Sequence, residues 1–187
     1  HKIQSFSEIL LKFSNVSNSR KIKVGIAGSE MLPFKYWQKI NEIEIAEIGE
    51  VDEMILKQRS IKSPQEIKVI EHAYFIAEKG IQKGIDIIQK GISEREIAAE
   101  IEYEMRKLGS EGMGIDTIVG SGKENTRPIL TRTTSRKVDE GDHVLLTIAP
   151  RYEGYHGAIG RIVAIGEINE NIPKAYEVAV KAQEEVI

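Results

Sequence analysis

The feature that most constrains the fold is the stretch from His143 to Gly166, which predicts a β-hairpin. Aliphatic and β-branched residues dominate both sides of this stretch, and the join at Arg151–Gly154 follows a proline and ends on a glycine. Side chains two residues apart share one face of a strand, and residues paired across a hairpin lie within about 5 Å of one another. We therefore expect Thr147 and Ala158 to face the same cavity.

Two capping boxes predict two long antiparallel helices before this hairpin. The first is Ser63–Glu66, in which proline occupies the first helical position and an apolar stripe follows as far as Gly91. The second is Ser93–Glu96, followed by apolar residues at helical spacing and by Gly109 as terminator. We expect both helices to be structural and assign them no chemistry.

The rest of the chain predicts a small number of further elements. These are a helix over residues 4–13, a strand over Lys21–Ala27, a helix from Ser29, a strand at Ile43–Ile48, a strand at Asp116–Gly120, a loop over Ser121–Arg132 and a last helix from Asn171 to Ile187.

Composition excludes several classes of function. The chain has 26 basic and 29 acidic residues, so its net charge of −3 gives no reason to expect a nucleic-acid or anionic-membrane partner. No apolar run approaches the roughly 20 residues that span a bilayer, and the N-terminus does not read as a signal peptide. The absence of cysteine excludes disulfides and thiolate chemistry, and fits a cytoplasmic location.

Several strings along the second half of the chain resemble one known superfamily. They are Gly114–Gly122, Thr134–Val138, Glu140–Leu146, Gly154–Tyr155 and Arg161. Together they resemble the aminopeptidase P, Xaa-Pro dipeptidase and creatinase superfamily, whose fold is called pita-bread.

The resemblance implies an α+β fold and a homodimer. Residues 58–187 would form the first half of a pita-bread catalytic domain, with two helices over a curved antiparallel sheet. Residues 1–57 would be the tail of a small α/β N-terminal domain. Nothing in the sequence corresponds to the second half of the catalytic domain.

The same resemblance locates the positions of the metal ligands. In the metallopeptidase members, the two hairpin strands each supply a metal-binding Asp, eleven residues apart, and these positions fall on Thr147 and Ala158. The substrate-side His of the family falls on Leu130, or on Ile129 if the loop is gapped. A pair of divalent cations requires charged oxygen or imidazole ligands. We therefore expect no metal and no other cofactor, as in the creatinase branch, which also lacks the two Asp residues and carries a proline and a tyrosine at Pro150 and Tyr155.

Candidate site residues follow from the same hairpin. His156 lies two residues from Ala158, so its imidazole is predicted to enter the pocket and act as the acid–base group, unless a bulge at Gly157 breaks the alternation. Tyr155, Thr147 and Arg132 are the predicted substrate contacts, because a hydroxyl and a guanidinium bind polar and carboxylate groups. The alternative for Tyr155 is aromatic packing.

Other titratable residues are expected to be structural. His143 is predicted to be a surface turn residue, and His72 a structural residue of the first long helix. Salt bridges are the expected role of Arg136 and Arg161.

Three functions stay open at this point. The leading one is a metal-independent hydrolase that cleaves a C–N bond of a small polar substrate, such as an amidino or amide compound. The runner-up is a non-catalytic relative that serves as a binding or scaffold module. The third is an Xaa-Pro metallopeptidase with unusual ligands. All three predict a small-molecule or short-peptide ligand.

Overall fold

The chain forms two compact units, His1–Lys62 and Ser63–Ile187. The computed structural model describes residue 5 and residues 8–10, 12–13, 22–44, 46–127 and 131–186. Of the helix predicted over residues 4–13, residues 8–10 and 12–13 are helical, and most of the remainder lies outside the described residues.

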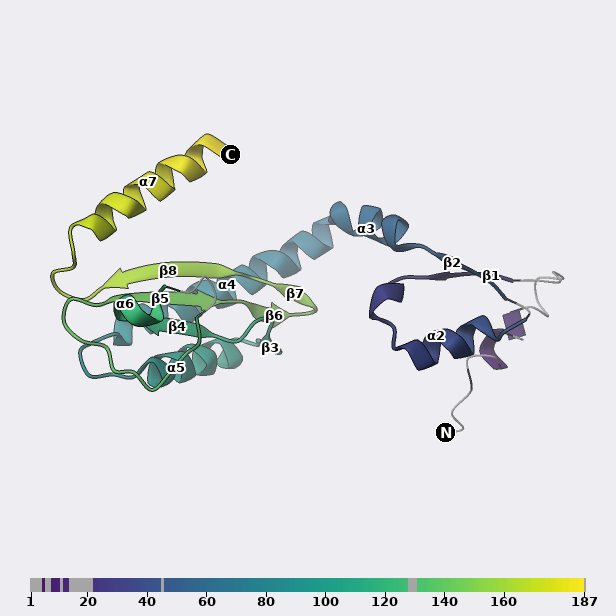
Figure 1. Cartoon of the computed structure of the whole chain (residues 1–187), viewed down its shortest axis with the longest axis horizontal. Helices are drawn as coiled ribbons and strands as arrows, with labels where there is room; N and C mark the ends of the chain where they lie inside the picture. Colours follow the sequence, from purple (N-terminus) through teal and green to yellow (C-terminus); the bar gives the residue numbers. More distant parts are fainter. Residues whose placement is uncertain are drawn as a thin grey trace. The chain divides into compact units, whose positions relative to one another are not determined.

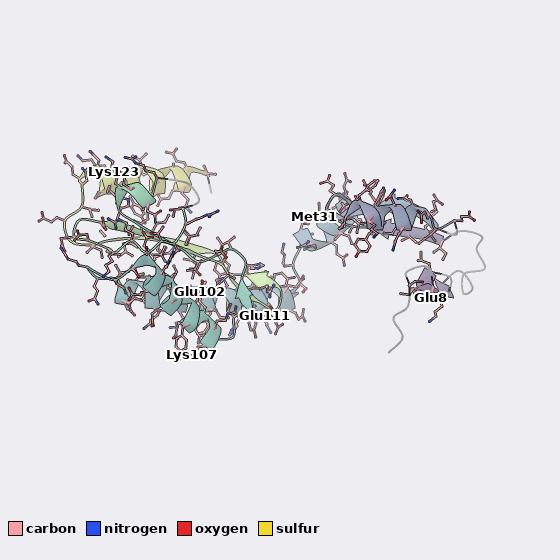
Figure 2. All side chains as sticks on the ribbon, turned by 60° about the horizontal axis from the view of Figure 1, so that its bottom comes forward. Glu8, Met31, Glu102, Lys107, Glu111 and Lys123 are labelled. Atoms are coloured by element: carbon pink, nitrogen blue, oxygen red, sulfur yellow. The ribbon has the colours of Figure 1, made fainter. Side chains whose placement is uncertain are left out.

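The first unit contains a strand–helix–strand segment. Strands β1 (Ile22–Ile26) and β2 (Ala46–Glu50) pair in parallel, with helix α2 (Phe34–Asn41) between them in sequence. The predicted helix begins at Phe34 and not at Ser29, because a 3-10 turn, η1 (Ser29–Met31), and Pro33 come first. Met31 projects from this unit and is 89% exposed (Figure 2). Helix α2 carries Trp37, the single tryptophan of the chain.

The sequence prediction missed helix α3 (Asp52–Ser60). Asp52 and Glu53 lie in its first turn and Lys57 and Arg59 in its last, so its charges complement the helix dipole. No residue of α3 is buried. Apolar periodicity, which the prediction relied on, therefore gave no signal here.

The second unit begins with the two predicted helices, α4 (Pro64–Ile87) and α5 (Glu94–Lys107). Both capping boxes are formed, since each N-cap serine accepts from the third backbone N–H and each third-position glutamate accepts from the serine N–H. Helix α4 ends at Ile87, before the predicted stop at Gly91, because the backbone of Ile88 adopts an extended conformation. The backbone N–H of Gly91 then donates to Val138 O at 2.8 Å.

The strands of this unit form two small antiparallel sheets. One sheet has the order β4 (Ile118–Ser121), β5 (His143–Ile148), β8 (Ile159–Ala164), and the short helix α6 (Gly122–Asn125) follows β4. The other has the order β3 (Gly112–Met113), β6 (Pro150–Tyr152), β7 (Tyr155–His156). The predicted hairpin is therefore present, but its two long strands and its tip belong to different sheets.

Two glycines shape the hairpin. Glu153 and Gly154 both have positive φ, 45° and 80°, and form the two-residue turn between β6 and β7. Gly157 lies between β7 and β8, where a Cβ would approach Ala73 O of α4 to 2.4 Å. Only glycine allows the hairpin backbone to come this close to the helix.

The core lies between the helices and one face of the β4–β5–β8 sheet, as Figure 1 shows. Val144, Leu146 and Ile148 of β5 are fully buried against apolar residues of α4 and α5. The predicted α+β class is confirmed. Helix α7 (Asn171–Val186), the predicted last helix, lies on the opposite side of the sheet from α5 (Figure 1). Within the described residues, no helix has the length and apolar character needed to cross a membrane.

Candidate functional site

The sheet has a second face, the open face, which neither α4 nor α5 covers. Side chains that alternate with the buried ones point to this face, so it carries His143, Leu145 and Thr147 of β5. The pairing register puts Thr147 opposite Gly160 of β8 and Ile118 of β4. A methyl group on Gly160 would lie 3.9 Å from Thr147 Oγ1. The side chain of Thr147 is thus half-buried, and the residues paired with it on either side, Ile118 and Gly160, are apolar.

Ala158 lies two residues before Gly160, just outside β8, and is exposed. If the alternation of β8 continues to this residue, Ala158 shares the face of Gly160 and Thr147, and this shared face stays a prediction. The two positions present one hydroxyl and one methyl group. Leu130 and Ile129, the predicted counterparts of the substrate-side His, lie outside the described residues.

His156 ends β7 and pairs with Arg151 of β6. Its ring packs against the backbone of Gly114, where an added Cβ would come within 2.4 Å of the ring. Strand alternation between His156 and Ala158 is interrupted at Gly157, whose N–H donates to Pro150 O at 3.2 Å. The acid–base role of His156 therefore stays a prediction without support from the alternation.

Tyr155 is half-buried and donates its hydroxyl to Glu66 Oε1, in the first turn of α4. The contact joins the hairpin tip to the capping box, because the other oxygen of Glu66 accepts from Ser63 N–H at 2.7 Å. Next to it, the ring of Tyr152 lies 4.4 Å from that of His72, which agrees with a structural role for His72. A substrate contact by Tyr155 stays a prediction.

The predicted arginines differ in their surroundings. Arg132 is exposed, and its carbonyl accepts from Asn125 Nδ2 at 3.2 Å. Its role in substrate binding stays a prediction. Arg136 forms the expected salt bridge, with Asp142 at 2.6 Å. Arg161 is exposed, and its guanidinium donates to Gly160 O at 2.7 Å.

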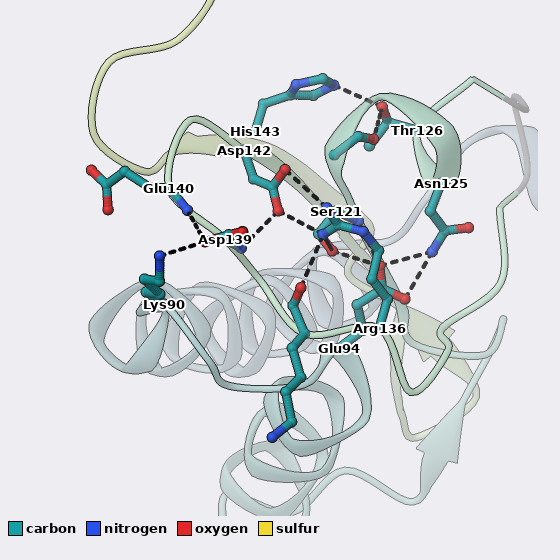
Figure 3. Close-up of polar contacts among 12 residues, drawn as sticks. Lys90, Glu94, Ser121, Asn125, Thr126, Arg136, Asp139, Glu140, Asp142 and His143 are labelled. Carbon is teal, nitrogen blue, oxygen red and sulfur yellow. Dashed lines mark hydrogen bonds and ion pairs between the residues drawn. The ribbon is translucent and has the colours of Figure 1, made fainter.

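Among the described residues of the second unit, the carboxylate of Glu94 accepts many hydrogen bonds, and sequence reasoning missed it. Glu94 is fully buried at the first position of α5, and its carboxylate accepts hydrogen bonds from Ser121, Asn125 and Thr134 (Figure 3). Both the backbone N–H and the hydroxyl of Ser121 donate to it, each at 2.7 Å. The backbone N–H and the hydroxyl of Thr134 also donate to the Glu94 carboxylate, at 2.8 and 2.6 Å. One carboxylate thus ties α5 to the end of β4 and to both ends of the loop that follows it.

These donors fix the charge state of Glu94. Burial alone would raise the pKa of its carboxyl group, but the hydrogen bonds from Thr134, Asn125 and Ser121 outweigh burial and hold the pKa below its ordinary value. Burial would likewise raise the pKa of Asp142, but the hydrogen bond and charge of Arg136 and the backbone N–H of Asp139 together outweigh burial and lower it. The guanidinium of Arg136 therefore lies near two ionised carboxylates, those of Asp142 and Glu94. Its Nη1 also donates to Ser121 Oγ at 2.7 Å.

His143 differs from its predicted role as a turn residue. It is the first residue of β5 and half-buried, and its Nε2 lies 2.7 Å from Thr126 Oγ1 (Figure 3). The Thr126 hydroxyl donates its proton to Gly122 O at 2.7 Å, so it accepts from Nε2–H of His143. His143 therefore holds helix α6 against the strand.

Comparison with protein families decides the assignment, because residues 68–187 match the family described as metallopeptidase family M24. This chain belongs to family M24.

Individual M24 relatives agree with that assignment. The chain is 32% identical over 180 residues to an Xaa-Pro dipeptidase of Pyrococcus horikoshii. The matched segment covers 94% of this chain and 51% of the relative. It also resembles the crystal structure of an X-Pro aminopeptidase from Thermotoga maritima, with a TM-score of 0.85 and 29% identity over 98% of this chain and 51% of the other. For the prolidase from Pyrococcus furiosus, the TM-score is 0.81 and the identity 31%, over 98% and 52% of the two chains.

The predicted superfamily and its pita-bread fold are thereby confirmed, and the chain spans about half the length of these relatives. Closeness to the metal-free branch stays a prediction.

The two hairpin positions of this M24 chain carry no side chain suited to a pair of metal ions. A hydroxyl at Thr147 is a weak ligand for a divalent cation, and the methyl group of Ala158 is none. Across the described part of the chain, no three His, Asp or Glu side chains gather closely enough to hold a metal. The carboxylates of Glu94 and Asp142 already accept several hydrogen bonds from protein donors. At these two positions the chain therefore presents a hydroxyl and a methyl group in place of charged ligands.

Proposed function

We propose that this chain is a metal-independent member of family M24 that binds a small polar C–N compound or a short peptide at the open face. The observation that supports it most is the pairing of Thr147 with Gly160, next to Ala158, where only a neutral hydroxyl and small groups stand. The class of ligand comes from relatives named Xaa-Pro dipeptidases. Thr147 on this face is the first proposed contact to the ligand; Arg132 on the loop and Tyr155 at the hairpin tip, whose hydroxyl also donates to Glu66 of α4, are two further proposed contacts.

Hydrolysis of a C–N bond is the second candidate function. It is favoured by His156, an exposed imidazole in the same hairpin, directly after Tyr155. In this proposal the imidazole accepts the proton of the attacking water as the C–O bond forms, and the imidazolium then donates it to the leaving nitrogen as the C–N bond breaks. The His156 ring packs against the backbone of Gly114. For this reason binding without turnover is the first candidate function and hydrolysis the second.

The proposal includes the organisation of the chain. Residues 1–57 are assigned to a partial N-terminal α/β domain and residues 58–187 to the first half of the catalytic domain, while the structural division falls after Lys62. A cytoplasmic location is supported by the absence of cysteine.

Metal content tests the proposal directly. Protein purified without chelator should contain well under one equivalent of Mn, Co or Zn per chain by plasma mass spectrometry. Its thermal midpoint should not change when Mn²⁺ is added. Two tightly held ions per chain would overturn the proposal and support an Xaa-Pro metallopeptidase.

A gain-of-ligand variant sharpens this test. The double substitution Thr147→Asp/Ala158→Asp restores two carboxylates on one face and should make the thermal midpoint rise with Mn²⁺. The matched control Thr147→Asn/Ala158→Asn has similar size without charge and should show no such rise. An equal response of the two variants would contradict the positions assigned to the ligands.

Ligand binding is tested by calorimetry with a panel of Xaa-Pro dipeptides, amides and amidino compounds. Thr147→Val, which keeps the shape and removes the hydroxyl, should weaken binding of any ligand found by roughly tenfold, equivalent to one lost hydrogen bond. His156→Ala should retain binding. Turnover by the wild type that His156→Ala abolishes would favour the hydrolase, whereas binding without turnover would favour the binding module.

A further inference from the structure

The amide side chain of Asn125, the last residue of α6, joins two distant parts of the chain. Its Nδ2 donates to both oxygens of the Glu94 carboxylate, at 2.9 and 2.8 Å (Figure 3). The same nitrogen donates to Arg132 O at 3.2 Å, and Oδ1 accepts from the Thr131 hydroxyl at 2.6 Å. One amide group thus connects a buried carboxylate of α5 to two consecutive residues of the loop after α6.

The Glu94 carboxylate determines which way this amide points. An ionised carboxylate only accepts hydrogen bonds, so it selects the NH₂ end of Asn125 and leaves the oxygen end to the Thr131 hydroxyl. The carboxylate also accepts directly from the N–H and the hydroxyl of Thr134, at 2.8 and 2.6 Å. Residues 131–134 are therefore held at one end through Asn125 and at the other end by Glu94 itself.

The anchored segment lies against the open face of the sheet. In β4, Ile118 pairs with Thr147, and Gly120, two residues further along, shares its face. A Cβ on Gly120 would approach Asn125 O to 2.6 Å and Thr131 Cγ2 to 2.7 Å. The two ends of the loop therefore meet the sheet at a strand position without a side chain, close to the proposed ligand contact of Thr147.

We propose that Asn125 is a positioning residue for Arg132, and that it fixes the Arg132 backbone at the border of the open face before a ligand arrives. Thr131 is buried, 5% exposed, whereas the next residue, Arg132, is exposed, so its guanidinium extends from a backbone that is already held. A group on a fixed backbone loses less conformational freedom on binding. This inference rests on the proposed contact between Arg132 and the ligand.

Cleavage by trypsin tests the anchor without any ligand. The bond after Arg132 is cut when this segment detaches locally, so the rate of the cut follows the population of the detached form. Asn125→Leu keeps the size of the side chain and removes every hydrogen bond of the amide. It should accelerate this cut by roughly tenfold or more, since one hydrogen bond alone is equivalent to about tenfold.

The matched control for this cut is Ser110→Ala. It removes another buried hydrogen bond of the same unit, from Ser110 Oγ to Gly112 O at 2.9 Å, and should leave the cut after Arg132 unchanged. An unchanged rate in Asn125→Leu, or an equal acceleration after Lys83 in α4, would overturn the proposal.

A distance measurement separates positioning from stability. The chain has no cysteine, so Arg132→Cys/Tyr103→Cys carries two nitroxide labels at known positions, the second on an exposed residue of α5. Pulsed electron paramagnetic resonance should give a narrow distance distribution with Asn125 present and a broad one in Asn125→Leu, while circular dichroism shows both folded. Equal widths would contradict the anchor. If Asn125→Leu does not fold, Thr131→Val, which removes only the bond to Asn125, replaces it in both tests.

The anchor and the ligand contact fail separately. Equal widths overturn the anchor and leave open whether Arg132 contacts a ligand. That contact is tested by calorimetry of Arg132→Gln with the panel of Xaa-Pro dipeptides, amides and amidino compounds. Wild-type affinity in Arg132→Gln would show that Asn125 holds a residue that contacts no ligand, and would overturn the positioning role even if the anchor is present.

Discussion

At the scale of single residues, the buried carboxylate of Glu94 organises more of the second unit than any predicted site residue. Its oxygens accept from Ser121, Asn125 and Thr134, which lie 27 to 40 residues further along the chain. A buried charge with this many donors is stable only as long as all of them stay in place. Glu94 therefore fixes the start of the loop that borders the open face.

Replacing this carboxylate should be costly. Glu94→Gln keeps the size but turns an amide donor toward groups that already donate, so we expect the free energy of unfolding to fall by roughly 2–4 kcal/mol. Urea denaturation measures the change. The control Glu102→Gln, on the same helix but partly exposed (Figure 2), should change stability by less than about 0.5 kcal/mol.

The same carboxylate should make stability depend on pH. The pKa of Glu94 is lowered in the folded state, below the value of about 4.3 in an unfolded chain. The unfolded state then binds more protons, so the contribution is complete above that value and is lost as the pH falls through the folded pKa. Glu94→Gln should therefore lose less stability than the wild type on acidification. Parallel curves for both proteins would contradict this.

The sequence predicted some of these residues and not others. Alternation and spacing within one hairpin predict that Thr147 and Ala158 share a face; the register pairs Thr147 with Gly160, two residues after Ala158, and the shared face stays a prediction. Glu94 gave no such signal, because an acidic residue in the first turn of a helix usually faces solvent and balances the helix dipole. Its burial depends on contacts with residues far along the chain, which no local pattern encodes.

At the scale of elements, local signals predicted α4 and α5 well. Capping boxes act within four residues, so Ser63 and Ser93 identify the helix starts from the sequence alone. The division of the hairpin into two sheets was not predicted. The division falls at Gly157, which approaches the backbone of Ala73 in α4, and a contact between such distant segments has no local sequence signal.

This approach gives a prediction for the hairpin. Gly157→Ala would place a methyl group 2.4 Å from Ala73 O, so the hairpin has to move off α4, and we expect a loss of roughly 2–3 kcal/mol in the free energy of unfolding. Gly160→Ala is the matched control, since its nearest neighbours would be 3.9 Å away. Urea denaturation of both variants decides the matter, and similar losses would mean that the close approach is unimportant.

At the scale of the whole molecule, burial is very unequal between the two units. Every residue of the apolar core cluster lies between Ile76 and Ile148, whereas Leu10 is the one buried residue among the described residues of the first unit. Stability rises with the apolar area removed from water. The second unit should therefore carry nearly all of the folding free energy.

Separate expression tests this difference. Residues 63–187 alone should unfold cooperatively, with a thermal midpoint close to that of the full chain, because they contain the whole core cluster. Residues 1–62 alone should show no cooperative transition, because so little of this unit is buried. Circular dichroism during heating measures both, and loss of the transition in the longer segment would show that its core depends on the first unit.

Trp37, the single indole of the chain, lies in α2 of the first unit, outside the core cluster. Fluorescence excited selectively at tryptophan therefore senses the surroundings of one short helix. A melting curve recorded by this emission and one recorded by the helical signal of α4 and α5 would follow different events in the same polypeptide. A fluorescence titration that shows no change would accordingly say nothing about occupancy of the open face.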